Sequence, residues 1–123
     1  MNIEKIPCGG SILAAVTADE KILTDPASAL DLLMTARYEA DTKNVLIPKE
    51  LVADEFFILS SGIAGEILQK FINYGGKIAI YGDYSGYTSK PLKDFIYESN
   101  QGKDVFFVNT REEAIEALSR AAK

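Results

Sequence analysis

The stretch SSGIAGEILQKFINYGGKIAIYG, residues 60–82, decides the fold because it carries a helix signal, a stop signal and a strand signal in direct succession. From residue 62 to about residue 74 its apolar residues recur every three or four positions, as on one face of an α-helix. Gly75 and Gly76 end this helix, and the apolar run 78–81 predicts a buried strand. The helix residues expected to face the core are Ile63, Ala64, Ile67, Leu68, Phe71 and Ile72.

Upstream of this stretch, the sequence predicts another helix followed by a strand. Asp25 is a favourable N-cap and Pro26 a favourable first residue for a helix that we expect to end near Ala40. The apolar run 45–47 then predicts a short strand, which Pro48 ends. One face of the helix is predicted to carry Leu30, Leu33, Met34 and Arg37.

Downstream, the pattern predicts a helix, a strand and a last helix. The first of these helices is expected to begin at Pro91 and to end at Gly102, and the run 105–108 predicts the strand. Thr110 and Glu113 have the spacing of a capping box for the last helix. The residues expected to face the core are Leu92, Phe95, Ile96 and Ser99 in one helix and Ala114, Ile115 and Leu118 in the other.

The N-terminal residues predict a β-hairpin, with strands over residues 2–7 and 11–18 and a turn at Gly9 and Gly10. The elements therefore follow the order β-β-α-β-α-β-α-β-α. Strands that alternate with helices need crossover connections, and right-handed crossovers make such strands parallel. We predict a single α/β domain over residues 1–123, with one mixed, mostly parallel sheet and an antiparallel N-terminal hairpin.

Composition and charge exclude several classes of function. The 123 residues carry a net charge of -5, which is the wrong sign for binding phosphate backbones, so we expect no nucleic-acid partner. The chain has no histidine and one cysteine, Cys8, which removes histidine-dependent nucleophiles and the usual zinc sites. We therefore expect no metal and no cofactor. The lone cysteine, and the lack of a signal peptide or a membrane-length apolar run, indicate a cytoplasmic protein without membrane contact.

Ser60 and Ser61 stand directly before the helix of residues 62–74, and two interpretations of them stay open. In the first, a serine hydroxyl is the helix N-cap and accepts a hydrogen bond from a free amide of the first turn, which stabilises a helix by about 1 kcal/mol. In the second, the hydroxyls together with Gly62 and Gly65 mark an anion site or a contact surface at the positive end of the helix.

The loop of residues 82–90 is a second candidate site, because it follows a central strand and should emerge at the same edge of the sheet as Ser61. Its tyrosines offer flat faces, and its polar side chains offer hydrogen bonds and a cation. The alternative is an ordinary turn with half-exposed tyrosines. The candidate ligand or partner residues are Asp83, Tyr84, Ser85, Tyr87 and Lys90.

The quoted run 60–82 resembles the central motif of STAS domains, the fold of bacterial anti-sigma-factor antagonists. In that motif an Asp-Ser-Ser-Gly turn opens a helix, which is followed by Gly-Gly and a strand, and the predicted order of elements also matches. A partner kinase phosphorylates the second serine in those antagonists and thereby controls which partner they bind. The resemblance implies Ser61 as the phospho-acceptor with Ser60 beside it, and Leu59 stands where the motif has Asp.

The chain is also similar to a small bacterial family known as domain of unknown function 4180. The similarity lies in FFILSSGIAGEILQKFINY (residues 56–74), in SKPLKDFIYESNQGKDVFFV (residues 89–108) and in the length of the chain. It implies membership over nearly all residues. The family brings no activity that could be transferred to this chain.

Two functions follow as expectations. The first is a non-enzymatic cytoplasmic regulatory or protein-interaction domain, whose partner, such as a regulatory kinase, contacts the helix start and which is switched by phosphorylation at Ser60 or Ser61. The second is a small-molecule-binding domain or a weak hydrolase that uses a cleft between Ser61 and the 82–90 loop. In the hydrolase, Lys90 would be the base, since no histidine exists.

Overall fold

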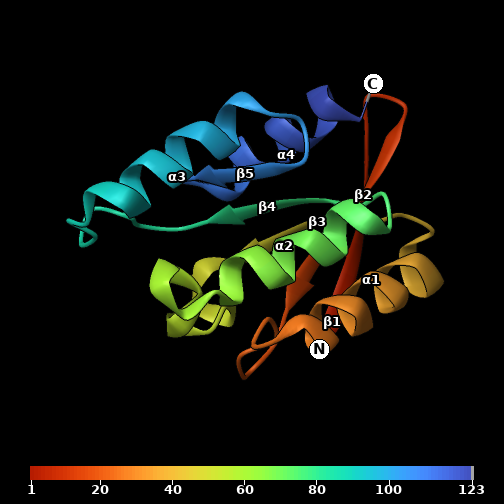
Figure 1. Ribbon diagram of the computed structural model, residues 1–123. Coiled ribbons are helices and arrows are strands. Elements are labelled where there is room, and N and C mark those ends of the chain that lie inside the picture. Colours follow the sequence, from red (N-terminus) through yellow and green to blue (C-terminus); the bar gives the residue numbers. More distant parts are fainter. Residues whose placement is uncertain (123) are drawn as a thin grey trace.

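The computed structural model describes residues 1–122, and within them it shows one five-stranded sheet (Figure 1). The strands lie side by side in chain order, with β1 and β2 antiparallel and the other pairs parallel. This confirms the predicted α/β class, the hairpin and the order of elements. The strands are β1 (Asn2–Cys8), β2 (Ser11–Thr17), β3 (Asn44–Pro48), β4 (Lys77–Tyr81) and β5 (Val105–Val108).

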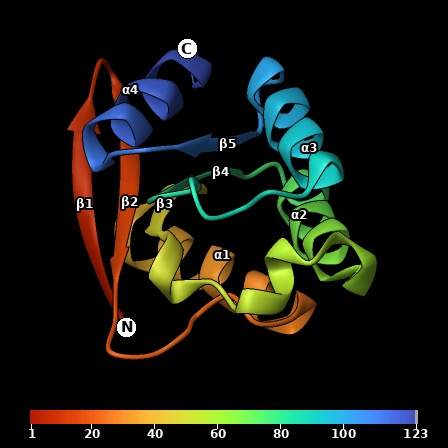
Figure 2. The ribbon, with the colours of Figure 1, turned by 90° about the vertical axis from the view of Figure 1, so that its left-hand side faces the viewer.

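The helices cover the two faces of the sheet unequally. Three helices lie on one face and α4 lies on the other, so that α4 and α1 are separated by the sheet in Figure 2. Successive right-handed crossovers between neighbouring strands place their helices on the same face, whereas α4 follows the last strand and is free of this constraint. The helices are α1 (Pro26–Ala40), α2 (Ile63–Asn73), α3 (Lys90–Gln101) and α4 (Arg111–Ala121).

Each face of the sheet has its own core, because side chains alternate between faces along a strand. In β4, Ile78 and Ile80 point into the larger core under α1 to α3, and Ala79 points toward α4. The α4 core is smaller and is built around Leu13, Ala15, Leu46, Ala79, Ala114 and Leu118. Its alanines leave room for α4 to pack close to the sheet.

The predicted core face of α1 is wrong except for Leu33. Met34 is 45% exposed, and Leu30 and Arg37 also lie outside the core. The helix turns its alanines inward because they let it pack closely on α2 and on the sheet. Alanine contributes little to a hydrophobic pattern, so the larger apolar residues on the solvent-facing side of α1 determined the predicted face. The buried residues are Ala29, Leu32, Leu33, Ala36 and Ala40.

The predicted helix starts are confirmed for α1 and α4, whereas α2 begins at Ile63, one residue after the predicted start, and α3 begins one residue before it. Asp25 caps α1 with Pro26 as its first residue, and Thr110 and Glu113 form the capping box of α4. Helix α3 begins at Lys90, one residue before the predicted start, because the Ser89 hydroxyl accepts a hydrogen bond from the Leu92 amide and acts as the N-cap.

Candidate functional site

The serine pair lies at the start of α2, but neither serine is the N-cap. Three short 3₁₀ turns, η1 (Lys49–Leu51), η2 (Asp54–Phe57) and η3 (Leu59–Ser61), connect β3 to α2. Gly62 then takes the N-cap position with φ of 79°, a left-handed conformation that favours glycine. The prediction that a serine is the N-cap is therefore wrong. The chain enters α2 from the 3₁₀ turn η3, and the residue that joins this turn to the helix is in a left-handed conformation that suits Gly62.

The Ser61 hydroxyl ties the turn to the segment before it. Ser61 Oγ donates a hydrogen bond to the Glu55 carbonyl oxygen at 2.8 Å and accepts one from the Ile63 amide at 3.2 Å. One free amide of the first helical turn is thus satisfied by Ser61, although this residue precedes the cap. Both Ser60 and Ser61 are exposed.

Residues 58–62, named the serine turn from here on, combine an exposed apolar side chain with hydroxyls. Ile58 is 55% exposed, and Ser60 and Ser61 follow it on the surface. Exposed carboxylates at Asp54 and Glu55 lie just before the turn, and Lys21 pairs with Asp54 at 3.4 Å. The serine turn therefore exposes an apolar side chain next to a largely acidic part of the surface.

The 82–90 loop, named the tyrosine loop, is held by its aromatic rings. The Tyr84 hydroxyl donates to the Ile80 carbonyl oxygen at 2.6 Å, and its ring centroid lies 6.0 Å from that of Phe57 and 6.0 Å from that of Phe107. Burial raises the pKa of the Tyr84 hydroxyl well above its ordinary value. Tyr87 stacks on Phe57 with a centroid distance of 5.1 Å.

Lys49 adds a cation to this aromatic cluster. Its Nζ lies 4.9 Å from the ring centroid of Tyr87 and 5.7 Å from that of Phe57. Its side chain also runs over Gly82, where a Cβ would come within 2.7 Å of the Lys49 Cβ. The ring faces that the sequence offered to a ligand are therefore in contact with side chains of this chain.

The polar residues of the tyrosine loop bond locally. The Ser85 amide donates to the Asp83 carboxylate at 2.9 Å, and hydrogen bonding by the side chain and the amide of Ser85 lowers the pKa of Asp83. Lys90 donates to Asp94 at 2.7 Å, and this hydrogen bond raises the pKa of Lys90. The Lys90 amine therefore stays protonated more firmly than a free lysine, which does not suit a general base.

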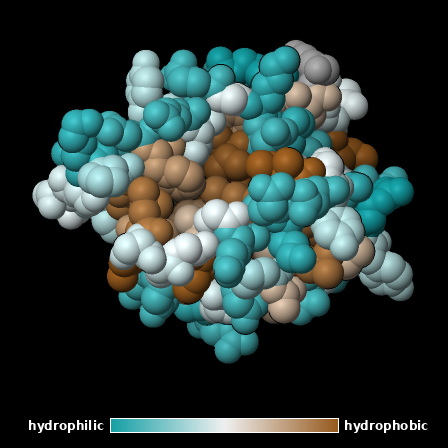
Figure 3. Space-filling view, in the orientation of Figure 1, coloured by the Kyte–Doolittle hydropathy of each residue, from teal (hydrophilic) through white to brown (hydrophobic). Residues whose placement is uncertain are grey.

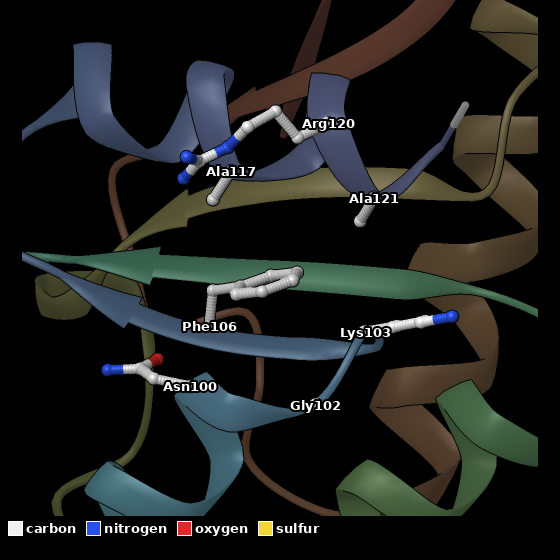
Figure 4. Close-up of a pocket in the computed structure, with 7 residues that line it drawn as sticks. All are labelled: Asn100, Gly102, Lys103, Phe106, Ala117, Arg120 and Ala121. Atoms are coloured by element: carbon white, nitrogen blue, oxygen red, sulfur yellow. The ribbon is translucent and has the colours of Figure 1, made fainter.

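Hollows lie on the surface away from the tyrosine loop, and one of about 520 Å³ is lined by Pro26 of α1 and by residues of α2, Gly65, Glu66, Gln69, Lys70 and Asn73. A second hollow, of about 350 Å³, has the Phe106 ring as its floor and lies under Ala117 and Ala121 of α4 (Figure 4). Arg120 and Lys103 flank it, and their charged ends point away from each other. Both cations lie near helix C-termini, where positive charge complements the helix dipole.

A third hollow is a trough of about 340 Å³ between α2 and α3, in which Gly65, Leu68 and Ile72 line one wall. Ile72 was expected in the core but is 49% exposed, because it lies at the edge of the apolar face of α2. Sequence reasoning missed this trough. The available signal was Gly65, a glycine inside a helix, where alanine is favoured by about 1 kcal/mol.

The fold and these surfaces define a small α/β domain with an exposed serine turn and an apolar trough beside it. The chain belongs to the family described as Domain of unknown function (DUF4180), whose model matches residues 9–118. No curated protein and no solved structure matches the sequence. Among residues 1–122, no helix has the length and apolar character to cross a membrane, and no group of three potential metal ligands comes together.

Proposed function

We propose that this chain is a protein-interaction domain whose contact surface is the serine turn. The observation that carries the proposal is the exposure of Ile58 directly before two exposed serines at the start of α2. Ile58 offers a partner an apolar contact, and the hydroxyls of Ser60 and Ser61 beside it offer hydrogen bonds, the combination of apolar centre and polar rim that protein interfaces use. The proposal includes a cytoplasmic location, which the single cysteine, Cys8, supports.

Phosphorylation of Ser61 is the proposed switch. A phosphate ester on Oγ has no proton to donate, so the Glu55 carbonyl would lose the hydrogen bond it now accepts at 2.8 Å. The phosphate would also add a charge of about -1.5 to -2 next to exposed carboxylates, which a helix N-terminus of about +0.5 offsets only in part. Modification would therefore change both the shape and the charge that a partner meets.

We further propose that the domain is STAS-like. The antiparallel hairpin, the alternation of parallel strands with helices, and the serine turn at the start of α2 support this classification. A STAS-like antagonist uses this turn for regulated partner binding, which agrees with the exposure of Ser60 and Ser61.

A small-molecule site or a hydrolase centre between Ser61 and the tyrosine loop has less support. Lys49 and Phe57 contact the ring of Tyr87, and the Lys90 amine is paired with Asp94. A ligand would have to displace these contacts before it could use the loop.

Affinity capture from the native cell tests the proposal with three variants. Ser61→Asp adds charge and removes the hydrogen bond to Glu55, Ser61→Ala removes the hydrogen bond alone, and Ser60→Asp adds charge at the neighbouring exposed position. We expect both Asp variants to recover less partner than wild type, while circular dichroism shows the same fold. Equal recovery of the same proteins by all variants and by wild type would exclude the serine turn as the contact surface.

A further inference from the structure

The two outer strands of the sheet, β1 and β5, differ in how their open edges are protected. Strand β1 carries Glu4, Lys5 and Pro7, and charges and proline on an outer strand discourage pairing with another chain. Strand β5 is the unbroken apolar run Val105–Val108, which contains no charge and no proline. Because valine and phenylalanine favour strand pairing, the sequence of β5 alone does not protect its edge.

Only alternate residues of β5 direct their backbone groups to the open edge. The carbonyl oxygens of Asp104 and Val108 accept hydrogen bonds at 2.9 and 3.0 Å from amides along β4 and just after it. Backbone groups alternate in direction along a strand, so Phe106 also faces β4. Val105 and Phe107 therefore direct their amides and carbonyls away from β4, toward the edge where no further strand lies.

Asn100 of α3 occupies the backbone groups of Phe107. Its side-chain nitrogen donates to the Phe107 carbonyl oxygen at 3.0 Å, and its side-chain oxygen accepts from the Phe107 amide at 2.7 Å. A side-chain amide combines a donor and an acceptor in one planar group, so Asn100 makes the two hydrogen bonds that a residue of an antiparallel neighbour would make. In Figure 4, Asn100 lies on the opposite side of β5 from the green ribbon of β4.

Hollows reach β5 from both faces of the sheet. Asn100 and Phe106 line the hollow of about 350 Å³ under α4, where the Phe106 ring is only partly buried (Figure 4). On the other face, Val105 lines the trough between α2 and α3, and Figure 3 shows apolar surface between the helices that Figure 1 labels so. The edge of β5 is therefore within reach of another chain, apart from the groups that Asn100 holds.

We propose that the Asn100 side chain closes the β5 edge and thereby keeps β5 from pairing with β5 of a second copy of this chain. An antiparallel pair centred on Phe106 would join Val105 of each copy to Phe107 of the other and would set the two Phe106 side chains opposite each other. Such a pair has two-fold symmetry and closes as a dimer. It needs the Phe107 groups that Asn100 now holds.

A second copy is the occupant that Asn100 excludes, because the symmetric pairing sets one uncharged apolar run against another. This inference goes beyond the proposed function, since it concerns the edge of β5 and no residue of the serine turn. It also explains why an asparagine stands in the last turn of α3, where its helix propensity is lower than that of alanine.

Asn100→Ala tests the closure, and Asn73→Ala, the same substitution at an exposed position at the end of α2, is the matched control. Sedimentation velocity of the full chain is measured over a wide range of concentrations. We expect the mass of Asn100→Ala to rise with concentration to about twice that of wild type. Asn73→Ala should sediment like wild type, and circular dichroism should show the same fold for all three. Equal masses of Asn100→Ala and wild type at every concentration would overturn the inference.

Hydrogen exchange followed by NMR locates the contact. In wild type the Phe107 amide should be protected, because it donates to Asn100. At low concentration Asn100→Ala should exchange this amide at least about tenfold faster, and dimer formation should restore its protection. The wild-type measurement stands even if the variant does not fold. Exchange of the wild-type Phe107 amide at the rate of an unstructured amide would refute the closure.

A synthetic peptide of residues 103–110, KDVFFVNT, probes the edge without dimerisation of the chain. Its control carries N-methyl groups at the residues equivalent to Val105 and Phe107 and lacks the amide hydrogens that pairing needs. We expect the unmodified peptide to bind Asn100→Ala at least about tenfold more tightly than wild type and to shift the Phe107 signal. The N-methylated peptide should bind neither protein. Equal binding of the unmodified peptide to both proteins, or shifts confined to other surfaces, would contradict the proposal.

Discussion

The serine turn and the tyrosine loop have similar compositions but opposite relations to the core. Both are rich in glycine and serine, and both follow the carboxyl ends of neighbouring parallel strands, β3 and β4. The tyrosine loop sends Tyr84 and Tyr87 against Phe57, whereas the serine turn leaves Ile58 in solvent. The difference lies in the aromatic side chains that anchor the loop, so the loop contributes to stability, and the exposed turn agrees with its proposed role as a contact surface.

The strongest way to break this comparison is to remove the anchor of the tyrosine loop. Phe57 is 6% exposed and contacts Phe56, Tyr84 and Tyr87. We expect Phe57→Ala to lower the free energy of unfolding by about 3–5 kcal/mol, as for other buried aromatic residues, measured by urea denaturation. A loss below about 1 kcal/mol would mean that the loop is not tied to the core.

The next largest effect concerns the hydroxyl of Tyr84. Tyr84→Phe removes the hydrogen bond to the Ile80 carbonyl and should lower the free energy of unfolding by about 1 kcal/mol at neutral pH. Urea denaturation measures this loss. An unchanged value would show that the bond adds nothing to stability.

The same tyrosine predicts a pH dependence. Burial raises the pKa of Tyr84 above its ordinary value of 10.0, so the unfolded chain loses this proton first as pH rises. Its contribution to stability is therefore complete below pH 10 and declines above it, with a limiting slope of about 1.4 kcal/mol per pH unit. Tyr84→Phe should show a shallower decline, and Tyr81, whose pKa burial also raises, accounts for part of the remainder. Identical slopes in the two proteins would contradict the burial of Tyr84.

A smaller effect is expected at Lys49, which holds the tyrosine loop from the outside. Lys49→Met keeps an unbranched apolar stem but loses the charge near the rings of Phe57 and Tyr87, and should cost about 0.5–1 kcal/mol of unfolding free energy. Lys93→Met, at an exposed position of α3, is the control and should change stability by less than about 0.5 kcal/mol. If the two substitutions changed stability equally, the cation–π contact of Lys49 would not contribute to stability.

The smallest effect on stability is expected in the serine turn itself. Ile58→Ser should change the free energy of unfolding by less than about 0.5 kcal/mol, because the side chain is already 55% exposed. Partner capture should nevertheless fall well below that of wild type. A large loss of stability would place Ile58 in the core and reverse its assignment to the contact surface.

Most of the fold could be predicted from the sequence because its signals are local. The apolar runs 45–47, 78–81 and 105–108 lie within observed strands, and Asp25 and Thr110 begin helices where predicted. The core face of α1 was missed, since its buried alanines carry little apolar signal. The 3₁₀ turns between β3 and α2 were also missed, because such short pieces have no periodicity to detect.

The structure of the candidate sites depends more than the fold does on contacts between residues that are distant in the sequence. Exposure of Ser60 and Ser61 agrees with a position at the start of a helix, which the sequence indicated. Occupation of the tyrosine faces by Lys49 and Phe57 did not follow from the sequence, because about 30 residues separate these partners from the loop and tertiary packing alone brings them together.

Site-specific photo-crosslinking tests the central claim most directly. A benzophenone amino acid placed at Ile58 reports what meets the serine turn in the native cell, and the same group at Tyr38, which is 91% exposed on α1, is the control. We predict a discrete crosslinked protein from position 58 that is absent from position 38. The same pattern from both positions, or a discrete partner from position 38 alone, would contradict the assignment of the serine turn as the contact surface.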